Sequence, residues 1–323
     1  MPAMDKKSAL KAKERELLLT KPPGSLGKLE EIVEWLVSWQ GRYPGKLENI
    51  KIAIFAGNHG VADRGVSAYP AEVTAQMVEN FNKGGAAINQ LANMIGAELE
   101  VIPLDLDTPV NDFTKAPAMD EKEFLSAFCK GMGVVDICTD LLCLGEMGIA
   151  NTTAASALSA SLFGGDPNDW IGTGTGLDNE GLKRKREVVS IGIKKHRIIK
   201  NNPIELMSCF SGREFAAILG AVVAARFCKV PTILDGFTCT AAASPIHLIS
   251  AGGLDHCQIA HLSQEPGHKK LLHALGRDAL IDFEMRLGEG TGAALSANLI
   301  RAALQIHSGM ATFSSAGISG PKD

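Results

Sequence analysis

The chain has 323 residues, of which 46% are hydrophobic and 21% are charged. This length suits one large domain or two ordinary ones, and the composition excludes a disordered or fibrous chain. The net charge of -4 excludes a basic surface for nucleic acid or anionic lipid, so we expect neither partner. The 34 glycines beside 5% aromatic residues favour a small-molecule site walled by backbone.

The cysteines and the N-terminus bear on the compartment. Seven cysteines occur without a Cys-x-x-Cys pair, and Cys138, Cys143, Cys228 and Cys239 lie in apolar runs. We therefore expect reduced core residues in a cytoplasmic protein. The first residues lack the apolar stretch of a signal peptide, and no segment is long and apolar enough to span a bilayer.

Taken in chain order, the hydrophobic pattern predicts helices first and then strands alternating with helices. Residues 9–40 are helical apart from a Pro- and Gly-rich turn at 20–27, and residues 290–316 are again helical and rich in alanine. Between them lie short apolar runs, which we predict to be strands: IKIAIFAG, LEVIPLDLDT, DLLCLG, PTILDG and CQIAHLS. Apolar strands that alternate with helices predict an α/β fold with a parallel sheet covered on both faces.

Polar clusters follow these strands directly. Asn58 and His59 follow the first strand, Glu146 follows DLLCLG, and Gln264 and Glu265 follow CQIAHLS. Ligands of open parallel sheets bind beyond the carboxyl ends of the strands, so this edge is the predicted site. The helices that come next begin with small or capping residues, whose free N–H groups favour a phosphate.

Two glutamates are the strongest candidates for chemistry. Glu146 stands between an apolar strand and a helix start, and a cap or salt bridge is the alternative to a role in the site. Glu289 lies between Gly288 and Gly290 near the apolar Leu287, where a carboxyl group could have a raised pKa and act as a general base. Its alternative is a favourable interaction with the following helix dipole.

Other motifs are weaker. Residues 172–185, GTGTGLDNEGLKRK, match neither nucleotide fingerprint, yet they suit a loop close to a ligand with Lys185 reaching its charge. The alternative is an ordinary turn before an exposed helix. His256, His261 and His268 lack the spacing of a metal site, so we predict structural histidines, with His261 and Ser263 free to line a pocket, and no metal.

Six motifs in one order carry a family resemblance. They are KPPGSLGKLEEI, AGNHGVADRGVSAYPAEVTAQMV, GEMGIANTTAASAL, GTGTGLDNEGLKRK, LDGFTCTAAA and MRLGEGTGAAL. Together they resemble the nicotinate-nucleotide:dimethylbenzimidazole phosphoribosyltransferases, which act in lower-ligand assembly of cobamides. The resemblance runs from about residue 20 to residue 319.

The resemblance implies a Rossmann-like parallel sheet flanked by helices, with residues 46–289 as the large domain. Residues 1–45 and 290–323 would form a small helical domain. It also implies a homodimer in which the neighbour closes the active site, and no cofactor. The implied reaction moves the phosphoribosyl group of nicotinate mononucleotide to 5,6-dimethylbenzimidazole, giving nicotinate and α-ribazole 5′-phosphate.

The same resemblance assigns roles to residues. Glu289 matches the catalytic base, and Glu146 matches a second site carboxylate that holds ribose hydroxyls or stabilises the oxocarbenium-like centre. The remaining matched positions bind substrate. Lys185 and Arg286 serve the phosphate or carboxylate with backbone at Gly148 and Gly176, Asp235 and Ser263 lie near the nucleotide, and the acceptor pocket contains Asn58, His59, Tyr69, Gln76, Met147 and Leu287.

Two alternatives stay open at this point. A related enzyme could transfer to adenine, another benzimidazole or a phenol. A binding protein for a nucleotide or a corrinoid precursor could keep the fold without catalysis. Retention of Glu146, Glu289, Lys185 and Arg286 argues against the second alternative.

Overall fold

The computed structural model describes residues 1–199 and 202–320. Its sheet has six strands, all parallel, in the order β2-β1-β3-β4-β5-β6. The strands are β1 (Ile50–Ala56), β2 (Glu98–Pro103), β3 (Leu141–Met147), β4 (Thr232–Leu234), β5 (Cys257–His261) and β6 (Ala279–Ile281). The predicted α/β fold with a parallel sheet is confirmed.

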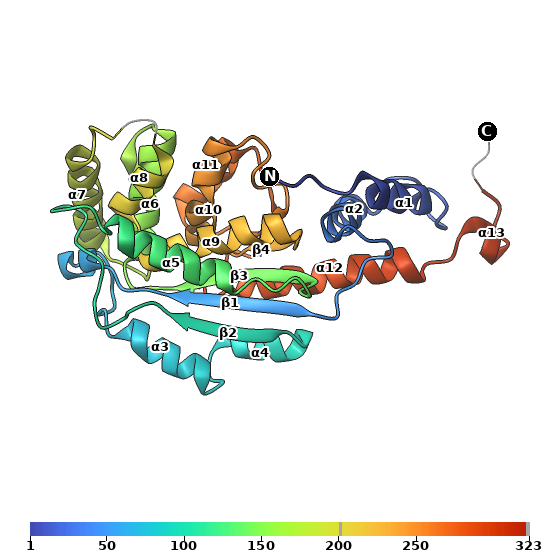
Figure 1. Ribbon diagram of the computed structural model, residues 1–323, viewed down its shortest axis with the longest axis horizontal. Coiled ribbons are helices and arrows are strands. Elements are labelled where there is room, and N and C mark those ends of the chain that lie inside the picture. The colour runs from blue at the N-terminus through green and yellow to red at the C-terminus, as the bar shows by residue number, and fades with distance from the viewer. Residues whose placement is uncertain (200–201, 321–323) are drawn as a thin grey trace.

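Helices connect the strands and extend the chain at both ends (Figure 1). The first seven α-helices are α1 (Lys6–Glu16), α2 (Lys28–Gln40), α3 (Val73–Asn82), α4 (Ala87–Ile95), α5 (Glu121–Gly133), α6 (Asn151–Phe163) and α7 (Asn179–Lys195). They are followed by α8 (Pro203–Phe210), α9 (Arg213–Cys228), α10 (Phe237–Ile249), α11 (Pro266–Leu275), α12 (Thr291–Gly309) and α13 (Phe313–Ala316). Two short 3-10 helices are η1 (Gly60–Arg64) and η2 (Pro167–Trp170).

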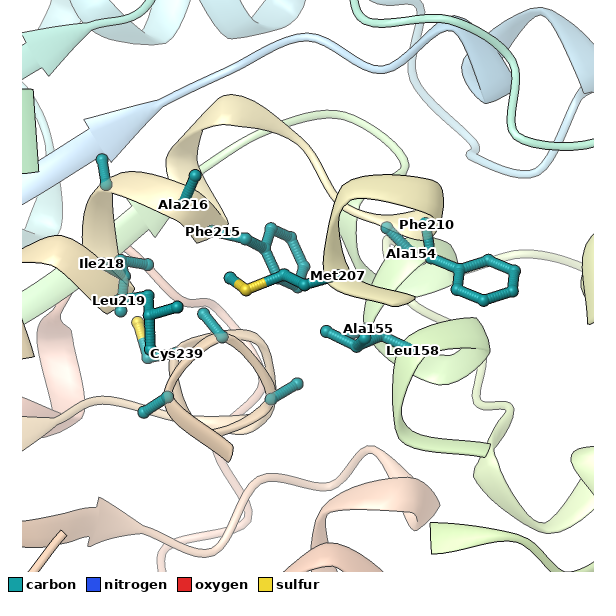
Figure 2. Packing of buried hydrophobic residues seen from close by; sticks show 14 of the residues in the cluster. Ala154, Ala155, Leu158, Met207, Phe210, Phe215, Ala216, Ile218, Leu219 and Cys239 are labelled. Carbon is teal, nitrogen blue, oxygen red and sulfur yellow. The ribbon is translucent and has the colours of Figure 1, made fainter. Parts of the chain in front are cut away.

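The sheet is buried on both faces, which explains why its strands are apolar at successive positions. Ala53 and Phe55 of β1 face a core shared with α5, α6, α8, α9 and α10. Ile52 and Ile54 point the other way, into a core shared with α2, α4 and α12. Figure 2 shows the first core, where side chains of α6, α8, α9 and α10 converge.

Most predicted elements occur, with one omission. The helices before and after the 20–27 turn are α1 and α2, and the helical C-terminal segment is α12 and α13. The sequence reading missed β6. This strand has only three residues, all partly exposed at the edge of the sheet, so it lacks the apolar run by which the other strands were recognised.

The prediction that the cysteines are core residues is only partly correct. All seven are free, and Cys143 and Cys239 are buried, whereas Cys138 is exposed and Cys228 is intermediate. Cys138 lies in the turn between α5 and β3, and this turn is at the protein surface. Within the described residues, no helix combines the length and the apolar composition needed to cross a membrane.

The two ends of the chain lie side by side. Arg15 of α1 donates through Nε to the carbonyl oxygen of His307 at 2.8 Å and through Nη2 to that of Ser308 at 2.9 Å. Figure 1 places α1, α2 and α13 at the end of the molecule where β1 begins, away from the tips of the strands. The division at residues 45 and 290 stays a prediction, and its last residues, 321–323, lie outside the described residues.

Candidate active site

A cavity of about 680 Å³ opens beyond the carboxyl ends of the strands. From β1 the chain goes to β2 on one side and returns to β3 on the other, so the strand order reverses beside β1. At such a point the loops after neighbouring strands diverge and leave a crevice. Segments after β1, β3, β4 and β5 line the cavity together with the residues just before α12.

Glu289 enters the cavity from the tight turn that precedes α12. Gly288, Glu289 and Gly290 all have left-handed backbone, with φ of 83°, 62° and 79°. Glycine adopts this conformation without cost, whereas a residue with a Cβ does so only when its surroundings hold it there. The Glu289 side chain is buried, and its Oε2 has no hydrogen-bond partner. Burial, aided by the negative charge of Asp235, raises the pKa of Glu289 to about 7.

Glu146 lies beside this turn on β3. Its backbone oxygen accepts the N–H of Glu289 at 3.2 Å, and its carboxylate accepts a hydrogen bond from the Asn151 side chain. A Cβ at Gly288 would lie 2.8 Å from Glu146 Oε1, so a side chain there would displace the Glu146 carboxyl group. Burial raises the pKa of Glu146 to about 8, assisted by the charges of Asp235 and Glu214. In the protein without a bound ligand, the Glu146 carboxyl group is therefore largely protonated at neutral pH.

Positive charge lies across the cavity, behind the glycine loop at residues 172–176. Lys185 is completely buried, and its Nζ donates to Thr152 Oγ1 at 2.9 Å and to the carbonyl oxygen of Gly172 at 3.0 Å. Burial lowers the pKa of Lys185 to about 8. The lysine therefore anchors the loop from within and is not the solvated side chain of an ordinary exposed helix.

Two further charged side chains hold the same loop at Gly174. Arg286 donates through Nη1 to the carbonyl oxygen of Gly174 at 3.0 Å, and the N–H of Gly174 donates to Glu265 Oε1 at 2.8 Å. The other oxygen of Glu265 is buried without a partner, and Glu265 lines the cavity. A fixed loop with cations nearby and carboxyl groups opposite suits an anionic ligand beside a titratable heterocycle.

Eight of the fourteen residues to which the family resemblance assigns roles line this cavity. They are Tyr69, Glu146, Met147, Gly148, Ser263, Arg286, Leu287 and Glu289. They come from segments that lie up to 220 positions apart in the chain, and the sheet brings them to one edge.

Six others do not line it. Asn58 and His59 are buried behind the strand ends, where Asn58 donates to the carbonyl oxygen of Leu106 at 2.9 Å and His59 Nε2 pairs with Glu214 at 2.5 Å. Lys185 and Asp235 are also buried outside the lining, and Gly176 is on the exposed side of its loop.

Gln76 is the sixth, and helical geometry explains its position. It is exposed on α3, whereas Val73 and Met77 of the same helix line the cavity. Residues four apart share a face of a helix, so the inward face of α3 carries Val73 and Met77 and turns Gln76 away. The apolar spacing of this segment could have identified that face.

Several lining residues received no role from the sequence: Ile149, Asn151, Thr152, Thr175, Phe237 and Thr238. Glu265 also lines the cavity, at the strand end where the sequence placed a polar cluster, although the sequence assigned it no role. The histidines separate as expected. His256 and His268 are buried in internal hydrogen bonds, and His261 lines the cavity.

Known proteins share the sequence and the fold of this chain. A family model described as phosphoribosyltransferase matches residues 1–318. The nicotinate-nucleotide–dimethylbenzimidazole phosphoribosyltransferase of Mesorhizobium japonicum is 54% identical over 319 residues, covering 99% of this chain and 95% of that protein. The Methylorubrum extorquens enzyme of the same name is 49% identical, covering 98% and 93%. The crystal structure of CobT from Thermus thermophilus superposes with a TM-score of 0.91 at 39% identity, covering 98% of this chain and 100% of that one. The chain belongs to the nicotinate-nucleotide–dimethylbenzimidazole phosphoribosyltransferase family.

Proposed function

We propose that the protein transfers the phosphoribosyl group of nicotinate mononucleotide to 5,6-dimethylbenzimidazole. The products are nicotinate and α-ribazole 5′-phosphate, used in assembly of the cobalamin nucleotide loop. The observation that supports this most directly is Glu289, a buried carboxyl group inside the cavity with a pKa of about 7. A base with this pKa accepts a proton efficiently near neutral pH.

The transfer is a single substitution at the ribose C1′. The unprotonated ring nitrogen of the acceptor attacks C1′ as the bond from C1′ to the pyridinium nitrogen breaks, and that electron pair stays on the departing nicotinate. The leaving nitrogen becomes neutral, so it needs no acid. The N–H proton of the acceptor's other nitrogen goes to Glu289, and attack opposite the leaving group inverts the anomeric centre.

Glu146 has the second role. A pyridinium ring and an oxocarbenium-like centre both carry positive charge, which favours an ionised carboxylate nearby. Binding of the nucleotide therefore lowers the high pKa of Glu146, and the resulting anion stabilises positive charge at C1′ or accepts a ribose hydroxyl. The hydrogen bond that the Asn151 side chain donates to Glu146 Oε2 keeps this carboxylate oriented.

We assign the anionic part of the nucleotide to the loop at residues 172–176. Arg286 at the rim supplies charge directly, and Lys185 supplies it from behind the loop, with the backbone N–H of Gly148 as a further donor. The N–H of Gly176 donates to the carbonyl oxygen of Thr173 at 3.0 Å, so Gly176 shapes the loop instead of binding the anion. Ser263 lies on the same side of the cavity. In this assignment Lys185 acts by holding the loop and by its field.

The acceptor ring packs between Tyr69, Met147 and Leu287, which line the cavity. Asn58 and His59 support the strand ends behind this pocket, and Gln76 stands outside it on α3. Transfer to adenine, another benzimidazole or a phenol is the alternative, and competition between these acceptors and dimethylbenzimidazole distinguishes them.

We further propose a cytoplasmic homodimer in which a neighbouring copy closes the cavity. The helices at the chain ends lie far from the strand tips in Figure 1, so the chain's own terminal helices do not cover its cavity. They expose three leucines, Leu10 by 56%, Leu17 by 67% and Leu18 by 57%. Seven free cysteines are consistent with a reducing compartment.

The variant Glu289→Gln tests the reaction. It removes the base and keeps the shape, so kcat should fall by roughly 10²- to 10⁴-fold, measured as α-ribazole phosphate formed from nicotinate mononucleotide and dimethylbenzimidazole. Calorimetry should show nucleotide affinity within a few-fold of wild type. Glu284→Gln, an exposed carboxyl group five positions earlier in the same segment, is the matched control and should keep full activity. Wild-type turnover in the Glu289→Gln protein would exclude this base, and a wild type that forms no product would exclude the function.

A further inference from the structure

Asp235 contacts the turn formed by residues 288–290, which carries Glu289, and does not line the cavity. It follows β4, and only 1% of its surface is exposed. Its Oδ1 accepts the N–H of Ala293 at 2.9 Å, and its Oδ2 accepts the N–H of Gly290 at 3.2 Å. Both carboxylate oxygens are therefore bonded to the backbone at the start of α12, and the side chain is buried outside the residues that line the cavity.

These bonds hold the residue that follows Glu289. The left-handed conformation of Glu289 is one that residues with a Cβ rarely adopt, so it must be held by its surroundings. Gly292 shows how closely the parts fit, since a Cβ there would lie 2.9 Å from Asp235 Oδ1 and 2.2 Å from the His261 ring. A side chain at Gly292 would push α12 away from Asp235 and shift the Glu289 turn.

Asp235 also places a charge beside Glu289. The titratable groups that interact with it are Glu146 and Cys143 on β3, Cys239 on α10, His261 on β5 and Glu289 itself. His261 Nε2 lies 3.9 Å from Asp235 Oδ1. Burial raises the pKa of Asp235, and the accepted N–H groups and the adjacent His261 ring oppose this rise by stabilising the ionised form. This negative charge adds to burial in raising the pKa of Glu289 to about 7.

We propose that Asp235 is a positioning residue, which fixes the Glu289 turn and keeps a negative charge next to the base, and that it is not a ligand of the nucleotide. This inference rests on the proposed function. It reassigns the substrate contact that the family resemblance implies for Asp235.

The variant Asp235→Asn removes the charge and mismatches one of the two N–H bonds while keeping the volume. Misplacement of the base should lower kcat by about 100-fold, and KM for nicotinate mononucleotide should stay within about 3-fold of wild type. The acidic limb of log kcat against pH should move to lower pH by about 1 unit, because Glu289 loses a charge that opposes its ionisation. Asp235→Ser, which removes the charge without adding bulk, serves as the second variant if the asparagine protein does not fold.

The matched control is Asp140→Asn, directly before β3 and therefore at the amino ends of the strands, away from the cavity. Asp140 is also buried and accepts two backbone N–H groups, those of Glu48 at 2.8 Å and Asn49 at 2.9 Å. Its variant should lose stability without any change in the pH profile. A rise in KM above about 10-fold with kcat retained would make Asp235 a substrate ligand, and loss of stability with an unmoved acidic limb would make it purely structural. Either result overturns the proposal.

A direct titration separates this inference from the proposed reaction. In protein labelled with ¹³C at glutamate carboxyl carbons, the Glu289 resonance is identified by its absence in Glu289→Gln. Its pKa should be lower in Asp235→Asn than in wild type by about 1 unit. If wild type forms no product, the proposed function fails, while an unchanged Glu289 titration would overturn the role of Asp235 on its own.

Discussion

Glu146 and Glu289 show how surroundings distinguish two residues of one type. Both are removed from water and both feel the charge of Asp235, so the pKa values rise to about 8 and about 7. Glu146 has the additional charge of Glu214 nearby and an amide partner in Asn151, whereas Glu289 Oε2 has no partner. A buried oxygen without a hydrogen-bond partner disfavours the ionised form of Glu289 in the free protein.

The pH dependence of wild type follows from these values. In the proposed reaction Glu289 acts in its ionised form, so kcat/KM should decrease below an apparent pKa near 7 as the base takes up a proton. It should also decrease above about pH 8, where Lys185 loses the positive charge assigned to the nucleotide anion. Since Glu146 interacts with Glu289, the apparent value belongs to the coupled pair. The measurement is initial rate at low substrate across pH 5.5 to 9, with roughly 0.5-unit steps.

Glu289→Gln is the control for this profile. Its residual activity should not show the decrease below pH 7, because glutamine does not titrate. An acidic limb centred near the ordinary glutamate pKa of about 4.3 would contradict the buried, Asp235-coupled environment of the base.

At the scale of single residues, flanking glycines were the informative signal. Glu289 between two glycines and Glu146 after a buried strand could be selected from sequence, because carboxyl groups seldom stand there for structural reasons. Gln76 could not be separated from Met77, since the direction of a side chain on α3 depends on how that helix meets the sheet. Lys185 was selected, but its complete burial behind the loop is a property of the packed structure.

At the scale of elements, close packing between α5 and α9 depends on glycines from both helices. A Cβ at Gly131 of α5 would lie 1.8 Å from the carbonyl oxygen of Ala217, and one at Gly220 of α9 would lie 2.0 Å from that of Phe128. Backbone cannot yield as a flexible side chain can, so these two glycines set the distance between the helices. This pair covers the face of the sheet that carries Phe55.

Gly131→Ala should therefore lower the free energy of unfolding by about 2 kcal/mol or more, measured by urea denaturation. Gly133→Ala, two positions further in α5 with open space around its Cα, is the matched control. It should leave stability unchanged or raise it by up to about 1 kcal/mol, since alanine loses less backbone entropy than glycine. Equal effects of the two substitutions would show that α5 and α9 can separate freely.

The strands illustrate what an element reveals by itself. Apolar residues on both faces made β1 and β3 recognisable, because each side of the sheet is covered by helices. The three residues of β6 are partly exposed at the sheet edge, and the pairing of His261 with Ile281 establishes the strand only in the assembled sheet.

At the scale of the whole molecule, Figure 1 shows α1, α2 and α13 at the end where β1 begins. The cavity is lined by residues at the other ends of the strands. Sedimentation of wild type should give a particle of twice the chain mass if a second copy supplies the missing cover. The double variant Leu17→Asp, Leu18→Asp should sediment at the single-chain mass and lose activity, since charges replace leucines that are exposed by 67% and 57%.

Ile137→Asp is the matched control for this experiment. Ile137 is 77% exposed in the turn before β3, at the amino ends of the strands and away from the cavity. Its substitution should change neither the sedimenting mass nor the activity. A fully active wild type at the single-chain mass would exclude the closing role of a neighbour.

The sequence by itself determined the fold class and the family, because apolar runs that alternate with helical segments and six motifs in one order are properties of the chain alone. It also selected Glu146 and Glu289 as candidates, from a strand end and from flanking glycines. The tertiary structure decided which side chains face the cavity. Asp235, Lys185, Asn58 and His59 were all expected at the substrate, yet each is buried against backbone or another side chain. Side-chain direction and burial depend on contacts between segments far apart in the chain, and residue type and spacing do not contain that information.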